Sequence, residues 1–69
     1  MNSAEIIKRM RNNAGLSRQE LADKVGATIS SVYNWESGKT SPSADTLLAI
    51  ARATGYDIVF QPIRFKYGD

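Results

Sequence analysis

Apolar residues recur three and four positions apart in four segments of the chain, which is the spacing of one helix face. These segments are residues 3–13, 17–25, 28–37 and 44–54. Each begins at a residue that can accept a hydrogen bond from the first helical turn, namely Asn2 or Ser3, Ser17, Thr28 and Ser43. Each ends at or just before a glycine: Gly15, Gly26, Gly38 and Gly55. The pattern therefore predicts four short helices.

The last fourteen residues, YDIVFQPIRFKYGD, have a different character. β-branched and aromatic residues dominate here, beginning with Ile58, Val59 and Phe60, and such residues favour a strand. Pro62 cannot donate to a β-ladder and marks its edge or end. We interpret residues 1–55 as one helical domain and residues 56–69 as a strand or tail. The fold class expected is all-α with a short C-terminal β-strand.

Only Gly26 and Ala27 join the second predicted helix to the third. So short a junction, with a glycine able to take positive φ, makes the third helix cross the second steeply. Val32 and Trp35 then face the core, which pushes the opposite face of the third helix out of the globule. This arrangement is a helix-turn-helix, and the projecting helix fits the width of the DNA major groove.

The projecting face of residues 28–37 carries no charged side chain, although a solvated helix face normally does. It consists of Ile29, Ser30, Tyr33, Asn34 and Ser37. Asn34 can pair with adenine, Ser30 and Thr28 can bond to bases or phosphates, and Ile29 can meet a thymine methyl. Arg18 and the start of its helix, and Lys39 in the following loop, can each hold a phosphate. The same uncharged face would also suit a protein partner.

The composition excludes several other classes of function. The 69 residues include no cysteine and no histidine, so disulfides and ordinary zinc sites are excluded. No glycine-rich phosphate loop or paired carboxylates suggest catalysis, so we expect neither an enzyme nor a bound cofactor. The absence of cysteine fits a cytoplasmic protein, which is the localisation expected. The charged N-terminal stretch does not resemble a signal peptide, and no apolar run could span a membrane. The net charge of +2 means that any nucleic-acid site is a focused patch.

Three stretches carry a family resemblance: GLSRQELADKVG, TISSVYNWESGKTSPS and TLLAIARATG. Residues 6–55 resemble the phage-repressor and Cro-like helix-turn-helix family, also called the Xre family. The resemblance implies a lambda-repressor-like four-helix DNA-binding domain whose third helix is the recognition helix. It places the base-reading and phosphate-touching positions of the recognition helix on Thr28, Ile29, Ser30, Tyr33 and Asn34, and the phosphate contact at the start of the second helix on Arg18. In the loop after the third helix, we expect Lys39 and Thr40 to contact phosphate as well. The resemblance also implies a structural ion pair between Arg11 and Glu36.

The function expected is that of a homodimeric transcriptional repressor of double-stranded DNA. A lone strand over Asp57–Ile63 would leave backbone groups unpaired, and pairing with the same strand of a second chain would satisfy them. Such a ribbon would bury Ile58 and Phe60, or Val59 in their place. A strand or coil folded back on its own helices is the alternative. Two other functions stay open: a DNA-binding antitoxin that also holds a toxin, and a helical adaptor with no DNA role.

Overall fold

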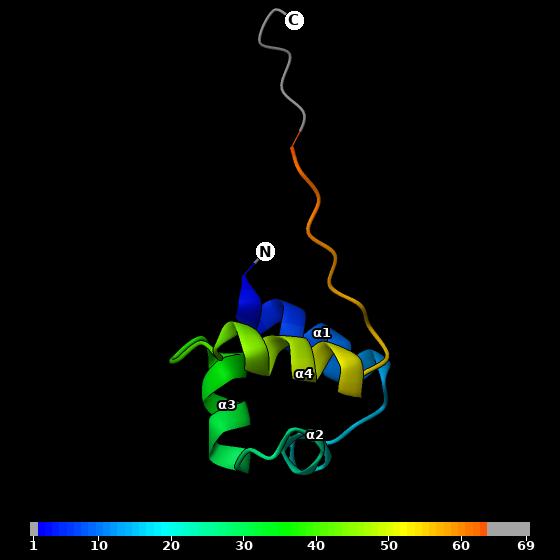
Figure 1. The fold of residues 1–69 in the computed structure, drawn as a ribbon. Coiled ribbons are helices and arrows are strands. Elements are labelled where there is room, and N and C mark those ends of the chain that lie inside the picture. Colours follow the sequence, from blue (N-terminus) through cyan, green and yellow to red (C-terminus); the bar gives the residue numbers. More distant parts are fainter. Residues whose placement is uncertain (1, 64–69) are drawn as a thin grey trace, which may run out of the picture.

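The computed structural model describes residues 2–63, and within them the chain forms four α-helices (Figure 1). These are α1 (Ser3–Asn13), α2 (Arg18–Val25), α3 (Ile29–Ser37) and α4 (Ala44–Ala53). Helices α1 and α4 lie side by side, and each of α1 and α2 packs against both α3 and α4. The predicted all-α, four-helix architecture is confirmed.

Each helix begins where the sequence supplies a capping side chain. The side chains of Asn2, Ser17, Thr28 and Ser43 each accept a hydrogen bond from a backbone N–H three residues later. At α2 the cap is reciprocal, because the Ser17 N–H also donates to the Glu20 carboxylate at 2.8 Å. Gly26 has φ +69° and ends α2 in the left-handed conformation, which turns the chain directly into α3.

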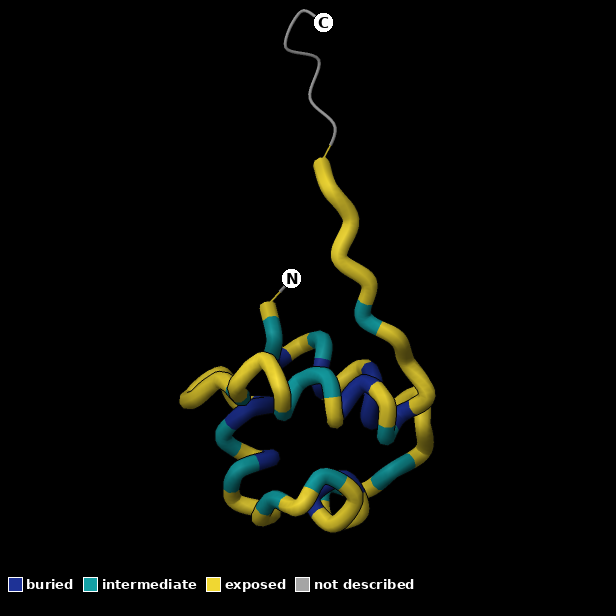
Figure 2. The backbone as a smooth tube through the Cα atoms, in the orientation of Figure 1, coloured by how far each residue is buried: buried dark blue, intermediate teal, exposed yellow. Residues whose placement is uncertain are grey.

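The core is built from one face of each helix (Figure 2). Ile7, Leu21, Val32 and Ile50, one from each helix, are fully buried. Trp35 is 8% exposed and belongs to this cluster, as its inward position in the predicted third helix indicated. Since Val32 and Trp35 both face inward, the opposite side of α3 is left at the surface of the domain.

The C-terminal segment differs from the prediction. Residues 56–63 form no strand; the segment starts against the helices, where the Tyr56 N–H donates to the Ala51 carbonyl, and then runs away from the helical body (Figures 1 and 2). A strand needs a ladder partner, and the described part of this single chain offers none because all its other elements are helical. Ile58 packs against the core, whereas Val59 and Phe60 are 65% and 86% exposed. The remainder of the predicted tail, residues 64–69, lies outside the described residues.

None of the helices described is long and apolar enough to cross a membrane. The longest, α1, has 11 residues. At about 1.5 Å of rise per residue it falls well short of a hydrocarbon layer roughly 30 Å thick.

Candidate nucleic-acid interface

Helix α3 presents one apolar face to the core and a second, uncharged face to the surface. Ile29 is 38% exposed and Tyr33 is 52% exposed, and Ser30 between them is also exposed. Asn34 is half-buried at the edge of this surface. The four residues predicted to read bases from within the helix therefore share one side of α3. We call this set, with the N-cap residue Thr28, the α3 outer face.

Thr28 has a structural role as the N-cap of α3, and its predicted DNA contact would have to use the same hydroxyl group. Its hydroxyl accepts from the Ser31 N–H at 3.1 Å and lies 3.0 Å from the Ser31 hydroxyl. These bonds fix the first turn of α3, and an N-cap of this kind contributes about 1 kcal/mol to helix stability. A base or phosphate contact by Thr28 would therefore have to use the remaining hydrogen-bonding capacity of the same oxygen.

Asn34 differs from Thr28, because its side-chain amide has no hydrogen-bond partner within residues 2–63. Its backbone carbonyl, in contrast, closes the end of the helix. The Lys39 and Thr40 N–H groups donate to this carbonyl at 3.0 and 3.2 Å. The amide is thus available for a bidentate contact of the type that recognises adenine, while the backbone beneath it is held in place.

The same two hydrogen bonds tie the loop after α3 to the helix. Gly38, with φ +78°, reverses the chain, so that Lys39 and Thr40 fold back onto the last turn of α3. Both side chains are exposed. A cation and a hydroxyl held beside the outer face suit phosphate contacts, which position a protein on DNA without reading its sequence.

A buried carboxylate lies behind the outer face. Glu36 is 6% exposed and Arg11 is 8% exposed, and the two form an ion pair through two hydrogen bonds of 2.5 and 3.0 Å. Arg11 also donates to the Leu16 carbonyl at 2.9 Å, which ties α1 to the turn before α2. The hydrogen bonds to Glu36 raise the pKa of the Arg11 guanidinium above its ordinary value. This pair joins α1 to α3. The structural role is sufficient to explain why a glutamate is buried at position 36.

Arg18 is the first residue of α2, as predicted, and its side chain makes two contacts within the domain. Its Nε donates at 3.0 Å to Glu36 Oε1, the oxygen that also accepts from Arg11 Nη2. Its guanidinium lies 4.6 Å from the centre of the Tyr33 ring. The side chain is about one-third exposed (34%). Arg18 therefore contacts both Glu36 and Tyr33. Neither contact could be predicted from the sequence, because both depend on how α2 packs against α3.

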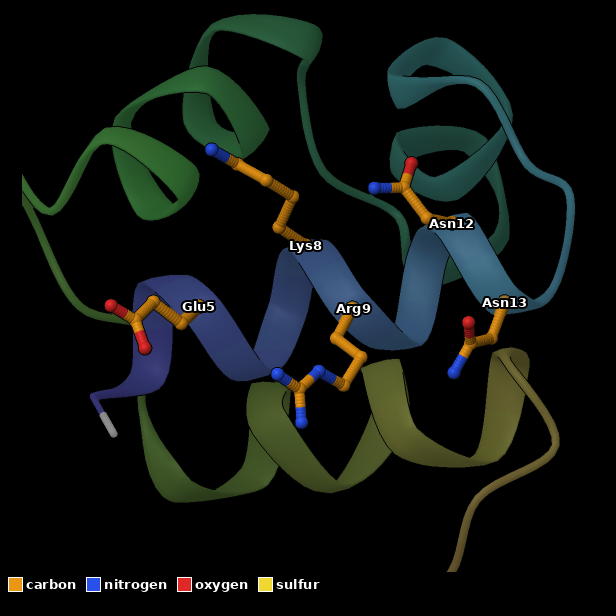
Figure 3. A pocket seen from close by; sticks show the side chains of 5 residues that line it. All are labelled: Glu5, Lys8, Arg9, Asn12 and Asn13. Atoms are coloured by element: carbon orange, nitrogen blue, oxygen red, sulfur yellow. The ribbon is translucent and has the colours of Figure 1, made fainter.

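A shallow hollow runs along the surface of α1 (Figure 3). Its lining comes from α1 alone: Glu5, Lys8, Arg9, Asn12 and Asn13. In the view of Figure 3, Lys8 and Asn12 point to one side of the helix, and Arg9 and Asn13 to the other. The charged side chains diverge and do not converge on a common point, so the hollow has the character of a solvated helix surface and not of a binding pocket.

Comparison with known proteins agrees with this geometry. A family model described as helix-turn-helix matches residues 7–61. An uncharacterized HTH-type transcriptional regulator of Methanothermobacter thermautotrophicus is 40% identical over 50 residues, which cover 72% of this chain and 72% of that protein. The residues matched by the family model include α2, α3 and the junction between them. The chain belongs to the phage-repressor and Cro-like helix-turn-helix family, the Xre family of DNA-binding transcriptional regulators.

Proposed function

We propose that this protein is a homodimeric transcriptional repressor that reads a specific DNA sequence by placing α3 in the major groove. The observation that carries the proposal is the division of α3 into two faces. Its inner face is anchored by Val32, Trp35 and the Glu36 ion pairs, so the outer face is held rigidly at the surface. A rigid uncharged face suits base edges, because an acidic group there would meet the phosphates on either side of the groove.

The roles within the outer face follow from the chemistry of each side chain. Asn34 has an amide without a partner in residues 2–63 and is assigned to an adenine. Ile29 is the apolar contact for a thymine methyl, and Ser30 and Tyr33 supply hydroxyl groups. Thr28, engaged as the N-cap, contacts DNA at the entrance to the helix. Lys39 and Thr40 hold a phosphate at its far end, and Arg18 one near the start of α2.

Dimerisation is proposed through the C-terminal segment. Val59, Phe60 and Ile63 are 65%, 86% and 75% exposed, which is unusual for large apolar side chains so close together. Ile58 packs against the core of its own chain and would hold the start of the segment in place. An antiparallel pairing with the same segment of a second chain would bury these side chains and satisfy the backbone groups. Two α3 helices would then read half-sites whose centres lie about 34 Å apart.

The same exposed segment favours a second candidate. Apolar side chains that are open in one chain can bind a different protein instead of a second copy, so an antitoxin whose C-terminal segment holds a toxin remains a candidate. Both candidates bind DNA through α3. A helical adaptor without a DNA role would use the outer face of α3 for a protein and would bind no duplex.

Selection of bound sequences from a random duplex pool tests the proposal. The wild-type protein is incubated with the pool at a physiological salt concentration, and bound duplexes are amplified and sequenced over several rounds. We expect enrichment of a palindromic sequence with half-sites one helical turn apart. Enrichment of a single half-site without symmetry would contradict the homodimer alone, whereas no enrichment of any sequence would contradict DNA reading by α3. Transcription in vitro from a promoter overlapping the selected site then tests repression.

A further inference from the structure

Arg18 links the buried ion pair to the α3 outer face. Its Nε donates to Glu36 Oε1 at 3.0 Å, while its guanidinium covers the Tyr33 ring at 4.6 Å from the ring centre. Glu36 is almost fully buried, and Tyr33 is half exposed. One side chain thus touches a fixed group inside the domain and a predicted base-reading group on its surface.

The inner end of this connection is firmly held. Glu36 is bound by Arg11 through two hydrogen bonds, and Arg11 is bound in turn to the Leu16 carbonyl. The Glu36 carboxylate therefore has little freedom to move, and the hydrogen bond from Nε fixes where the Arg18 guanidinium lies. Because a guanidinium is planar, it can donate to a carboxylate at its edge while its face lies over an aromatic ring. A lysine ammonium has no such plane and cannot make both contacts in the same way.

At the surface, Arg18 contacts the Tyr33 side chain, which would otherwise be free to change rotamer. An exposed tyrosine on a helix can occupy more than one χ1 rotamer. Contact with the guanidinium favours the rotamer in which the ring lies against Arg18. Tyr33 is thereby pre-set before any ligand arrives, and ligand binding does not have to immobilise it.

We propose that Arg18 is a positioning residue, held by Glu36, that fixes the Tyr33 ring in the orientation in which Tyr33 reads DNA. The proposal rests on the proposed function of α3 as a recognition helix. It differs from the phosphate contact assigned to Arg18, which requires only a positive charge near the start of α2. Under the positioning role, the planar shape of the side chain matters as well as its charge, and the effect of Arg18 on DNA passes through Tyr33.

Arg18→Lys separates the two roles, because it keeps the charge and removes the planar contact. Affinity for the selected duplex is measured by fluorescence anisotropy over a series of salt concentrations for four proteins: wild type, Arg18→Lys, Tyr33→Ala and the double variant. Selection from the random pool is repeated with Arg18→Lys. Arg52→Lys, an exchange of the same type at an exposed position of α4, is the matched control. Circular dichroism verifies that each variant is folded.

We expect Arg18→Lys to weaken binding about two- to fivefold, the size of an exposed cation–π contact, with an unchanged salt dependence. The exchange should have no further effect in the Tyr33→Ala background, and the selected site should lose preference at one position per half-site. Nuclear Overhauser contacts between the Arg18 side chain and the Tyr33 ring should be present in the free protein. Arg52→Lys should bind as wild type does.

Three results would overturn the positioning role while leaving DNA reading intact. These are the same selected site for Arg18→Lys and wild type, independent effects of Arg18→Lys and Tyr33→Ala, and an absence of contacts between the two side chains in the free protein. If wild type itself enriches no sequence, the proposed function fails and the positioning role fails with it. The selection with wild-type protein therefore distinguishes the two failures.

Discussion

Replacement of Glu36 by alanine should destabilise the domain more than any exchange on its surface. Glu36 is the common partner of Arg11 and Arg18, and its loss leaves Arg11, which is 8% exposed, without a counter-charge. Arg11 would keep only its hydrogen bond to the Leu16 carbonyl. A buried charge that has lost its partner typically costs about 3–5 kcal/mol.

That cost is large compared with the total stability of so small a domain. At roughly 0.05–0.15 kcal/mol per residue, a chain of 69 residues has a free energy of unfolding of about 3–10 kcal/mol. Glu36→Ala should therefore leave a protein that is close to unfolding at room temperature. Arg18→Met should cost less than about 1 kcal/mol, because Arg18 is one-third exposed and water can replace its contact with Glu36.

Urea unfolding followed by circular dichroism measures both free energies. Arg11→Met should lower the free energy of unfolding by about as much as Glu36→Ala does, because it leaves the buried Glu36 carboxylate with Arg18 as its single partner. Combining Arg11→Met with Glu36→Leu should recover much of the loss, since apolar side chains can replace a buried ion pair. The reasoning would be refuted if Glu36→Ala cost less than about 1 kcal/mol, or if Arg18→Met cost as much as Arg11→Met.

Three further predictions concern the loop after α3, the reciprocal Ser17–Glu20 cap of α2 and the C-terminal segment. Lys39→Ala should reduce the slope of the logarithm of the DNA-binding constant against the logarithm of salt concentration by roughly one, whereas Lys8→Ala should leave it unchanged. A slope for Lys39→Ala equal to that of wild type would show that Lys39 does not contact a phosphate. Hydrogen bonds from the Ser17 backbone N–H and hydroxyl lower the pKa of Glu20, so its stabilisation is present above the ordinary glutamate pKa of about 4.3 and is lost as the pH falls through the lowered value. Thermal melts should therefore show a smaller loss of stability on acidification for Glu20→Gln than for wild type, and equal losses would contradict this. Val59→Pro removes a ladder donor and should convert a dimer to a monomer in sedimentation equilibrium at micromolar concentration, with the helical signal kept; a mutant that stays dimeric, or a monomeric wild type, would refute the ribbon.

The helices were predictable because each carries its own local signals. A capping side chain begins each one, and a glycine follows the end of each, so neither boundary depends on distant parts of the chain. The strand at residues 57–63 was predicted wrongly for the single chain, since β-propensity describes a residue's suitability for a ladder and cannot supply the partner strand.

The outer face of α3 was predictable for the same local reason, because helical periodicity alone separates Tyr33 from Trp35. The contacts of the Arg18 side chain could not be predicted in this way. Eighteen residues separate Arg18 from Glu36, and no spacing rule says which guanidinium reaches a carboxylate across a helix interface. The Arg11–Glu36 pair was expected only through the family resemblance. The periodicity of a single segment thus indicates which face of a helix is free, but not which side chains of other helices reach it.

Sequence reading by α3 is tested most directly by the affinity of Asn34→Ala for the selected duplex and for variants with one base pair changed. The expected result is a loss of about 1–3 kcal/mol on the selected site, with preference relaxed at one base pair per half-site and nonspecific binding unchanged. An Asn34→Ala protein that binds every duplex more weakly by the same factor, with its base preferences intact, would contradict the account.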